Sequence, residues 1–334
     1  MNSGNDVTAN YAISYDTKVK GLTVGQVPLT IKAKDQAKCF GQGFNFAGTE
    51  FTTLGLLNSD VVNSVTLTSD GAAAPAAPGS YSIVPSDAAG SGLGNYSISY
   101  VNGNFTVNAH PTASISGTTA ICIGNTPDLT VKLLTGSGTI NGTLSDGTPF
   151  SGTAPSILTI NPATAPSTGI TTYTLATLTD ANGCSADPGE RTGSAVITVN
   201  ANSTISGPSV AGNDNQTVCI NEPISNISYT VGGGATGVKV VGLPKGVSSV
   251  FDASTGLVTI SGTPTDASSV YPYTVTTLGP CTNESMMGTI TVSANSTLDL
   301  TSSIQDTTQA ICIGTSLTPI TYLIDGGSTG HTVI

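Results

Sequence analysis

The sequence predicts an all-β chain built as a tandem array of small β-sandwich repeats. Residues that favour strands, mainly Thr, Val and Ile, recur in alternating runs, while 40 Gly and 18 Pro supply the turns. No window shows a sustained apolar pattern with the 3.6-residue period of a helix. Similar junctions, VNAHPT, VNANST and VSANST, begin at residues 107, 199 and 292, which are 92 (199 − 107) and 93 (292 − 199) residues apart. A period near 90 residues is the size of one β-sandwich.

The composition excludes several classes of partner. Charged residues make up 9% of the chain, against about 25% in typical soluble proteins. The net charge of −11 follows from only nine Lys and Arg residues, so the basic patch that nucleic acid requires is missing and no nucleic-acid partner is expected. No apolar run reaches 18 residues, so no membrane span is predicted. A Ser- and Thr-rich, charge-poor chain with regularly spaced cysteines indicates an extracellular protein, because disulfides persist outside the cell.

The first two segments share a Tyr-rich strand pattern. Residues 1–26 are predicted to be the C-terminal tail of a truncated repeat, and residues 27–108 a complete one. The strand PLTIKAK places Leu29, Ile31 and Ala33 on one face. In the stretch NYSISYVNGNFTV, Asn102-Gly103 separates two alternating runs and predicts a β-hairpin.

Three further segments follow the recurring junctions. Residues 109–200 and 201–293 are each predicted to form one complete β-sandwich. Residues 294–334 align with the start of the preceding repeat at an offset of 93, so that Cys312 matches Cys219 and Tyr322 matches Tyr229. This last segment is expected to be the N-terminal part of a further repeat that is interrupted at Ile334.

The cysteines predict a disulfide within each complete sandwich. Cys122 and Cys184 stand 62 residues apart (184 − 122), and Cys219 and Cys281 repeat that spacing (281 − 219). A bond closing such a loop stabilises by roughly 4 kcal/mol in the chain-entropy account. Cys312 is expected to be unpaired in this chain. Cys39 has no partner in its own segment, which leaves either a buried free thiol or a reactive one. No C-x-x-C pair or cysteine with a neighbouring His indicates zinc.

No catalytic site, cofactor or metal site is expected from the sequence. The two histidines, His110 and His331, lie outside the interiors of the complete repeats, so no Ser-His-Asp or Cys-His set can form there. The acidic residues fall mostly in turns, where Asp bonds its own backbone. The stretch Asp180–Gly183 offers oxygen ligands without the longer loop of a calcium site, so a plain turn is expected, with bound calcium as the alternative.

Two motifs carry a resemblance to known families. The combination of PLTI, SVTLTS (64–69) and NYSISYVNG in residues 27–108 resembles MBG-type repeats of bacterial surface proteins. The stretch GLPKGVSSVFDASTGLVTISGTPT (242–265), with VCIN before it and YPYTVTTLGPC after it, resembles the Ig-like repeats of SprB-like giant surface adhesins of gliding Bacteroidetes. The segment 109–200 is similar to another repeat of those proteins.

This resemblance implies a cell-surface adhesin. Its family is exported by the type IX secretion system, associated with the outer membrane, carried along by the gliding machinery, and attached to surfaces. We therefore expect a non-catalytic stalk whose partners are its neighbouring repeats, the gliding and type IX machinery, and a surface polysaccharide or other substratum. Two alternatives remain: a glycan- or protein-binding module, and accessory repeats of a secreted hydrolase.

Overall fold

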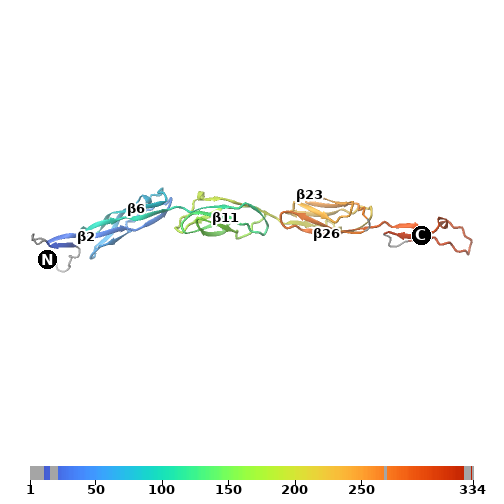
Figure 1. Cartoon of the computed structure of the whole chain (residues 1–334), viewed down its shortest axis with the longest axis horizontal. Coiled ribbons are helices and arrows are strands. Elements are labelled where there is room, and N and C mark those ends of the chain that lie inside the picture. The colour runs from blue at the N-terminus through green and yellow to red at the C-terminus, as the bar shows by residue number, and fades with distance from the viewer. Residues whose placement is uncertain (1–10, 16–21, 267–268, 327–331, 333–334) are drawn as a thin grey trace. The chain divides into compact units, whose positions relative to one another are not determined.

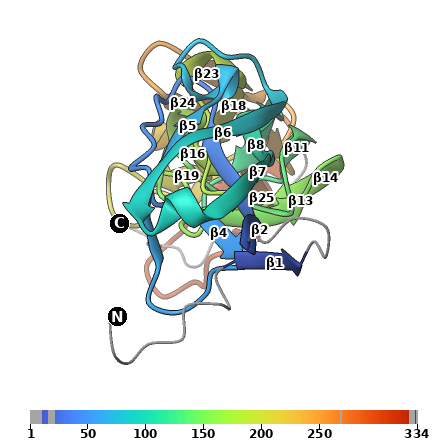
Figure 2. The same ribbon diagram turned by 90° about the vertical axis from the view of Figure 1, so that its left-hand side faces the viewer.

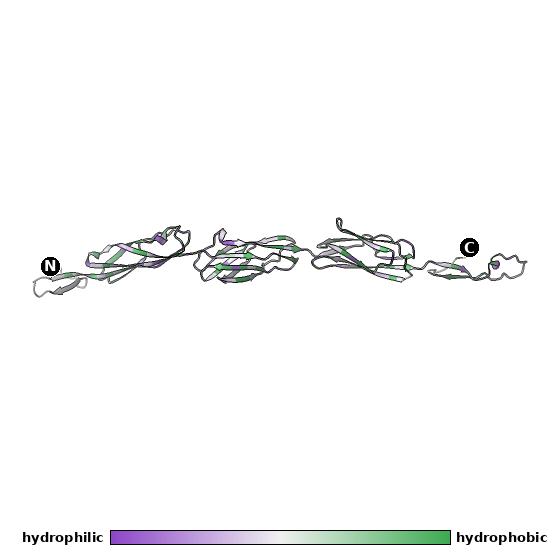
Figure 3. Ribbon diagram, turned by 45° about the horizontal axis from the view of Figure 1, so that its top comes forward, coloured by the Kyte–Doolittle hydropathy of each residue, from purple (hydrophilic) through white to green (hydrophobic). Residues whose placement is uncertain are grey.

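The structure is a computed structural model that describes residues 11–15, 22–266, 269–326 and 332. Nearly all of its regular elements are β-strands, and the helices among these residues are 3-10 turns of three or four residues (η2 Asp70–Ala72, η3 Leu93–Asn95, η4 Pro188–Glu190 and η5 Ile304–Thr307). Hydrophobic and hydrophilic residues alternate along many strands (Figure 3), as expected for sheets with one buried face. The chain is therefore all-β, as the sequence predicts.

The chain divides into two compact units. The first contains residues 1–118, 127–163 and 172–196, and the second contains residues 119–126, 164–171 and 197–334. This division does not follow the predicted repeat boundaries, which remain predictions. No helix within the described residues has the length and hydropathy needed to cross a membrane.

Residues 11–108 form two sheets in the first unit. In one sheet β2 (Leu22–Ala33) lies between β1 (Tyr11–Tyr15) and β4 (Phe51–Leu54), and β7 (Tyr96–Val101) pairs with β2 in parallel. Figure 2 shows β1 in dark blue and β2 in a brighter blue. The other sheet has the order β3-β8-β6-β5, formed by Gln36–Cys39, Gly103–Asn108, Gly79–Ser91 and Val61–Thr68. Strands β2 and β6, one from each sheet, are labelled in Figure 1.

The predicted core face of β2 is confirmed. Leu29, Ile31 and Ala33 are buried in one apolar cluster with Ile83 and Phe105 of the facing sheet. The aromatic ring of Phe44 packs edge-on against Phe105 with 5.1 Å between ring centroids. These contacts give the segment its own core, built from residues between Val27 and Val107.

The hairpin predicted at Asn102-Gly103 is wrong. Strand β7 pairs with β2, whereas β8 pairs with β3 and β6, so the chain crosses from one sheet to the other at this point. Crossing lets Tyr96 at the start of β7 and Phe105 in β8 enter the same core. Gly103 fits here because a Cβ atom would lie 2.7 Å from the Ala33 carbonyl oxygen.

Residues 112–200 form three sheets. Strand β11 (Leu129–Thr135) pairs with β9 (Thr112–Ser116) and β14 (Ser156–Ile160), and β17 (Arg191–Gly193) extends β9 in parallel. Strand β12 (Thr139–Leu144) lies between two others, β13 (Pro149–Thr153) and β16 (Leu175–Thr179). The third sheet has the order β10-β18-β15, formed by Thr119–Cys122, Ala195–Asn200 and Gly169–Tyr173.

Residues 203–293 form two four-stranded sheets in the second unit. One has the order β19-β21-β24-β23, formed by Ser203–Ser206, Ile227–Gly233, Leu257–Gly262 and Val247–Asp252. The other has the order β20-β26-β25-β22, formed by Asn215–Cys219, Ser285–Ser293, Ser269–Leu278 and Gly237–Val241. Their inner faces share one core, in which the hydroxyl groups of the buried Tyr229 and Tyr273 lie 2.9 Å apart. The remaining pair, β27 (Thr297–Leu300) and β28 (Tyr322–Asp325), is antiparallel.

The DASTG stretch forms the turn between β23 and β24. Asp252 accepts hydrogen bonds from the Ser254 N–H (2.9 Å) and from the Thr255 hydroxyl (2.7 Å). Hydrogen bonds from Ser254 and Thr255 stabilise the carboxylate and lower the pKa of Asp252 to about 2. Gly256 closes the turn with a positive φ of 71°, a conformation that favours glycine.

Candidate functional site at the junctions

One cysteine of each complete segment occupies the same place in the fold. It is the last residue of a short strand that runs parallel to the final strand of its own segment, and it lies opposite the last residue of that final strand. The pairs are Cys39 with Asn108, Cys122 with Asn200, and Cys219 with Ser293. Each of these early cysteines therefore lies at the end of its segment, where the chain continues into the next one.

The backbone fixes this position in the same way each time. The residue after the cysteine donates its N–H to the carbonyl oxygen of the final-strand residue, at 2.9 Å in all three cases: Phe40 to Asn108, Ile123 to Asn200, and Ile220 to Ser293. A turn then closes as Gln42, Asn125 and Glu222 donate back to the carbonyl oxygens of Cys39, Cys122 and Cys219. Because these bonds use backbone atoms, the site does not depend on the neighbouring side chains.

The late cysteine Cys184 lies at the opposite end of its segment. It is in the turn after Asp180, whose Oδ1 accepts the N–H groups of Asn182 and Cys184 at 3.0 Å each. The Asn182 side chain donates to Asn108 Oδ1 (3.1 Å), at the last residue of β8. Cys184 is thus held beside the point where the chain enters residues 109–200.

The two disulfides connect an early cysteine to the late cysteine of the following segment. Cys39 is bonded to Cys184 and Cys122 to Cys281, with sequence separations of 145 and 159 and Cα–Cα distances of 5.5 and 5.6 Å. The predicted bonds Cys122–Cys184 and Cys219–Cys281 are therefore wrong, and so are both predictions for Cys39 as a free thiol. Cys219 and Cys312 are free and exposed.

The observed pairing has a simple physical cause. Equal spacing showed that Cys122 and Cys184 belong to one repeat, but not at which end of the repeat each lies. Strand β10 is parallel to β18, which puts Cys122 opposite Asn200, while the Asp180 turn puts Cys184 beside Asn108. Sulfur atoms at opposite ends of a sandwich are too far apart for a bond, since bridged Cα atoms lie within about 7 Å.

The second junction has the same construction as the first. Cys281 belongs to the connection before β26, and its Sγ lies 3.7 Å from the Asn200 carbonyl oxygen. The Ser203 N–H donates to the Thr282 carbonyl oxygen at 2.9 Å. This loop is therefore fixed beside the chain as it leaves β18, where Cys122 meets it.

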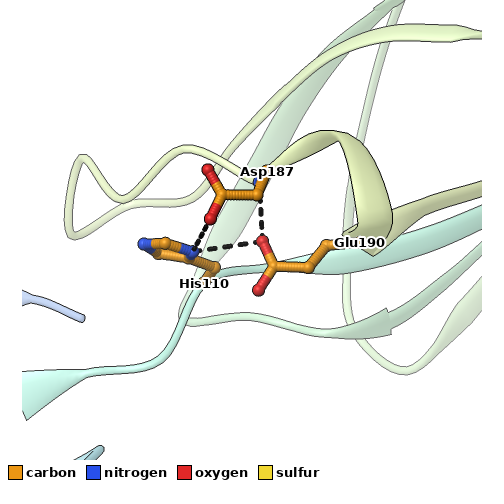
Figure 4. Close-up of side chains that lie close together, drawn as sticks. All are labelled: His110, Asp187 and Glu190. Carbon is orange, nitrogen blue, oxygen red and sulfur yellow. Dashed lines mark hydrogen bonds and ion pairs between the residues drawn. The ribbon is translucent and has the colours of Figure 1, made fainter. Parts of the chain in front are cut away.

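A histidine and two carboxylates lie next to the Cys39–Cys184 bridge. His110 is in the short connection between β8 and β9, and only 10% of its side chain is exposed. Its Nδ1 lies 3.1 Å from Glu190 Oε2 and 3.7 Å from Asp187 Oδ2 (Figure 4). Its Nε2 lies 3.0 Å from the Phe40 carbonyl oxygen. One oxygen or nitrogen atom from each of the three side chains lies within 4.8 Å of the others, which is close enough to share a cation.

The short η4 turn positions the two carboxylates. Asp187 precedes this turn and Glu190 ends it. The Asp187 N–H donates to Glu190 Oε2 at 2.6 Å, and the Glu190 N–H donates to the Asp187 carbonyl oxygen at 3.0 Å. Sequence reasoning missed this group, because His110 and Glu190 are 80 residues apart and no short motif links them. His331 lies outside the described residues.

The Asp180 turn is used for backbone hydrogen bonds. Besides the two N–H groups on Oδ1, the Ser137 N–H donates to Asp180 Oδ2 at 3.1 Å, and the side chain is buried. Carboxylate oxygens that face several N–H groups are already satisfied. The turn predicted for Asp180–Gly183 is present.

One segment of the chain matches a known protein family. Residues 29–106 match the family described as MBG domain (YGX type), which confirms the MBG-type resemblance of this segment. None of the curated protein sequences matches the chain.

The similar solved structures are tandem immunoglobulin domains. A titin fragment of three Ig domains with a Glu-to-Ala substitution is 11% identical, with 80% of this chain and 97% of that chain covered and a TM-score of 0.44. An I-band fragment of titin has the same identity and coverage with a TM-score of 0.42. Immunoglobulin domains 1–5 of Sidekick-1 are 8% identical, covering 84% of this chain and 65% of that chain, with a TM-score of 0.35. The chain is an all-β protein, and its residues 29–106 form an MBG segment.

Proposed function

We propose that this chain is a non-catalytic stalk segment of a large cell-surface adhesin, and that disulfides lock its junctions. The observation that carries the proposal is the pairing of two early cysteines, Cys39 and Cys122, each with the late cysteine of the next segment. A bond within a repeat would stabilise that repeat alone. A bond across a junction instead fixes one repeat to the next, which is what a load-bearing connector requires.

The two disulfide loops overlap, which limits how far the chain can be stretched. The first loop runs from Cys39 to Cys184 and the second from Cys122 to Cys281, so residues 122–184 belong to both. The shortest covalent path from Cys39 to Cys281 crosses both bonds and contains only the 62 residues between Cys122 and Cys184 (184 − 122). Even complete unfolding of both loops therefore leaves a short tether.

Cys219 extends this pattern to the next junction. It has the same strand register and the same backbone hydrogen bond as Cys39 and Cys122, yet its thiol is free and exposed. We propose that Cys219 forms a third bridge, to the late cysteine of the repeat that follows residues 201–293. Cys312 would be the early cysteine of that following repeat. Disulfide mapping of the cell-derived protein should find Cys219 bonded to a cysteine of a later repeat; a free Cys219 thiol there would contradict the extension.

Two properties support the surface location and the adhesive role. Disulfides persist outside the cell, and each bridge here closes a long loop between segments. The sequence resemblance to surface adhesins of gliding bacteria supports attachment and gliding, and the family match in residues 29–106 agrees with a repeat protein of that kind.

The proposed function is tested by labelling this segment on living cells. A fluorescent antibody against residues 27–293 is predicted to bind intact cells and to show foci that travel along the cell surface. Foci that stay still would support a surface adhesin and would contradict a role in gliding. Antigen found only in the medium would contradict the surface stalk.

A further inference from the structure

The hydrogen bond of His110 to Phe40 determines which ring nitrogen carries a proton. Nε2 lies 3.0 Å from the Phe40 carbonyl oxygen, and a carbonyl oxygen can only accept. Nε2 must therefore carry a hydrogen. The other nitrogen, Nδ1, then either carries a second proton, which makes the ring an imidazolium, or presents its lone pair.

Nδ1 faces two carboxylate groups in this structure. Glu190 Oε2 lies 3.1 Å away and Asp187 Oδ2 3.7 Å away. A bare lone pair directed at two carboxylate oxygens is repulsive, so a proton or a cation must lie between them. The three groups therefore form a site for a shared proton or for a bound metal ion.

We propose that His110, Asp187 and Glu190 bind a divalent transition-metal ion of the Zn²⁺ class. The ion would be held by Nδ1 and by one oxygen of each carboxylate, and solvent would fill a fourth position. Binding to the imidazolium form releases the Nδ1 proton to water, while the Nε2–H bond to Phe40 stays intact. Two carboxylates then neutralise the doubly charged ion.

The geometry and the donor atoms favour this class of ion. Metal–ligand distances of about 2.0–2.2 Å in a tetrahedral site place ligand atoms about 3.3–3.6 Å apart, and the two distances from Nδ1 fall on either side of that range. Imidazole nitrogen with carboxylate oxygen suits Zn²⁺ and its neighbours, whereas Ca²⁺ takes oxygen ligands only. Asp187 is 74% exposed and can adjust.

Supporting contacts already orient the ligands. Phe40 holds the far side of the imidazole, and the Asp187 N–H holds Glu190. Such outer contacts are typical of metal-binding histidines and carboxylates. An open hollow of about 370 Å³, lined by residues that include Phe40, Gln42, His110 and Asp187, gives the ion a path from solvent.

The ion would act beside the first junction. Its three ligands, His110, Asp187 and Glu190, all belong to residues 109–200, and the contact with the preceding segment is the Nε2–H hydrogen bond to the Phe40 carbonyl oxygen. By holding the imidazole against the two carboxylates, the ion would fix the ring that makes this hydrogen bond. This effect does not depend on the redox state of the cysteines.

Calorimetric titration of the whole chain with ZnCl₂ tests the proposal. The free thiols of Cys219 and Cys312 must first be blocked with iodoacetamide, because both are exposed and would bind Zn²⁺ themselves. We expect one site, with chemical-shift changes at the amides of Phe40 and Asp187. Asp187→Asn and His110→Gln should each weaken binding at least tenfold.

The controls separate this site from other zinc binding and from misfolding. Glu222→Gln, an exposed carboxylate in another segment, should bind Zn²⁺ as the unmodified chain does. Asp187 is largely exposed, so its substitution leaves the fold intact, which circular dichroism would verify. Equal Zn²⁺ affinity in the Asp187 and His110 variants, no binding at all, or tighter binding of Ca²⁺ than of Zn²⁺ would overturn the proposal.

Discussion

Cys39 and Cys184 are bonded across 145 residues of chain, although Cys184 has another cysteine, Cys122, within its own segment. The partner is decided by the end of the sandwich at which each sulfur lies. Asn108 is next to both members of the bond, through its strand register with Cys39 and its side-chain contact with Asn182. The end of β8 therefore brings the two cysteines together.

The first prediction concerns the pattern of disulfides. Proteolysis of the unreduced chain, followed by mass spectrometry, should yield one linked peptide pair containing Cys39 and Cys184 and another containing Cys122 and Cys281. Alkylation without denaturant should modify only Cys219 and Cys312, because these two thiols are free and exposed. A linked peptide pair containing Cys122 and Cys184 would show that the bonds lie within repeats.

The second prediction concerns the buried tyrosine pair. The Tyr273 hydroxyl lies 2.9 Å from the Tyr229 hydroxyl and donates to the Asp214 carbonyl oxygen at 3.3 Å. Tyr273→Phe removes the hydroxyl that makes both hydrogen bonds and should lower the local free energy of unfolding by about 1–3 kcal/mol, because the buried Tyr229 hydroxyl loses its partner. Hydrogen exchange of the amides of β21 and β25 measures this local free energy of unfolding. The half-exposed Tyr322 provides the control, since Tyr322→Phe should leave those amides unchanged.

The third prediction concerns alkaline pH. Burial raises the pKa of Tyr96, Tyr173, Tyr229 and Tyr273 above the usual value of 10. The unfolded chain then loses these protons at lower pH than the folded chain, so the stabilisation is complete below pH 10 and is lost as pH rises beyond it. Absorbance at 295 nm should show these four phenols ionising together with loss of the β-sheet circular dichroism. Ionisation of all ten tyrosines near pH 10 with an unchanged sheet signal would contradict this.

The fourth prediction concerns the glycine of the DASTG turn. A Cβ on Gly256 would lie 2.3 Å from the Val231 carbonyl oxygen, and the φ of +71° is unfavourable for alanine. Gly256→Ala should therefore destabilise residues 201–293 by about 1–3 kcal/mol. Gly237→Ala is the matched control, because its Cβ would meet only Leu278 at ordinary contact distance. Urea denaturation of the two variants would measure the difference in stability. Equal midpoints for Gly256→Ala and Gly237→Ala would contradict the predicted destabilisation at Gly256.

Much of the fold could be predicted because it depends on local patterns. Alternation placed Leu29 and Ile31 in the core, and the recurring junctions coincide with the ends of β8, β18 and β26. The hairpin at Asn102-Gly103 could not be predicted correctly, because its turn signal is local while the pairing partners of β7 and β8 are distant. Tertiary packing of Tyr96 and Phe105 outweighed the turn propensity.

The site could be predicted only in part. Disulfides were predicted for Cys122, Cys184, Cys219 and Cys281, with Cys39 as a free thiol, but the pairing depends on strand direction, which spacing does not contain. The group of His110, Asp187 and Glu190 was missed for a similar reason, since it forms only when η4 meets the β8–β9 connection. Both features belong to junctions between segments and not to any one repeat.

Single-molecule stretching between residues 39 and 281 tests the central claim most directly. With both bridges intact, full unfolding should extend this part of the chain to a limit of 62 residues, about 210 Å. Reduction should raise the limit to 242 residues (281 − 39), about 830 Å. Bonds within repeats would instead leave 83 residues before Cys122 (122 − 39) and 35 between Cys184 and Cys219 (219 − 184), about 400 Å together. A limit near 400 Å in the oxidised chain, or one that reduction does not change, would contradict disulfide-locked junctions.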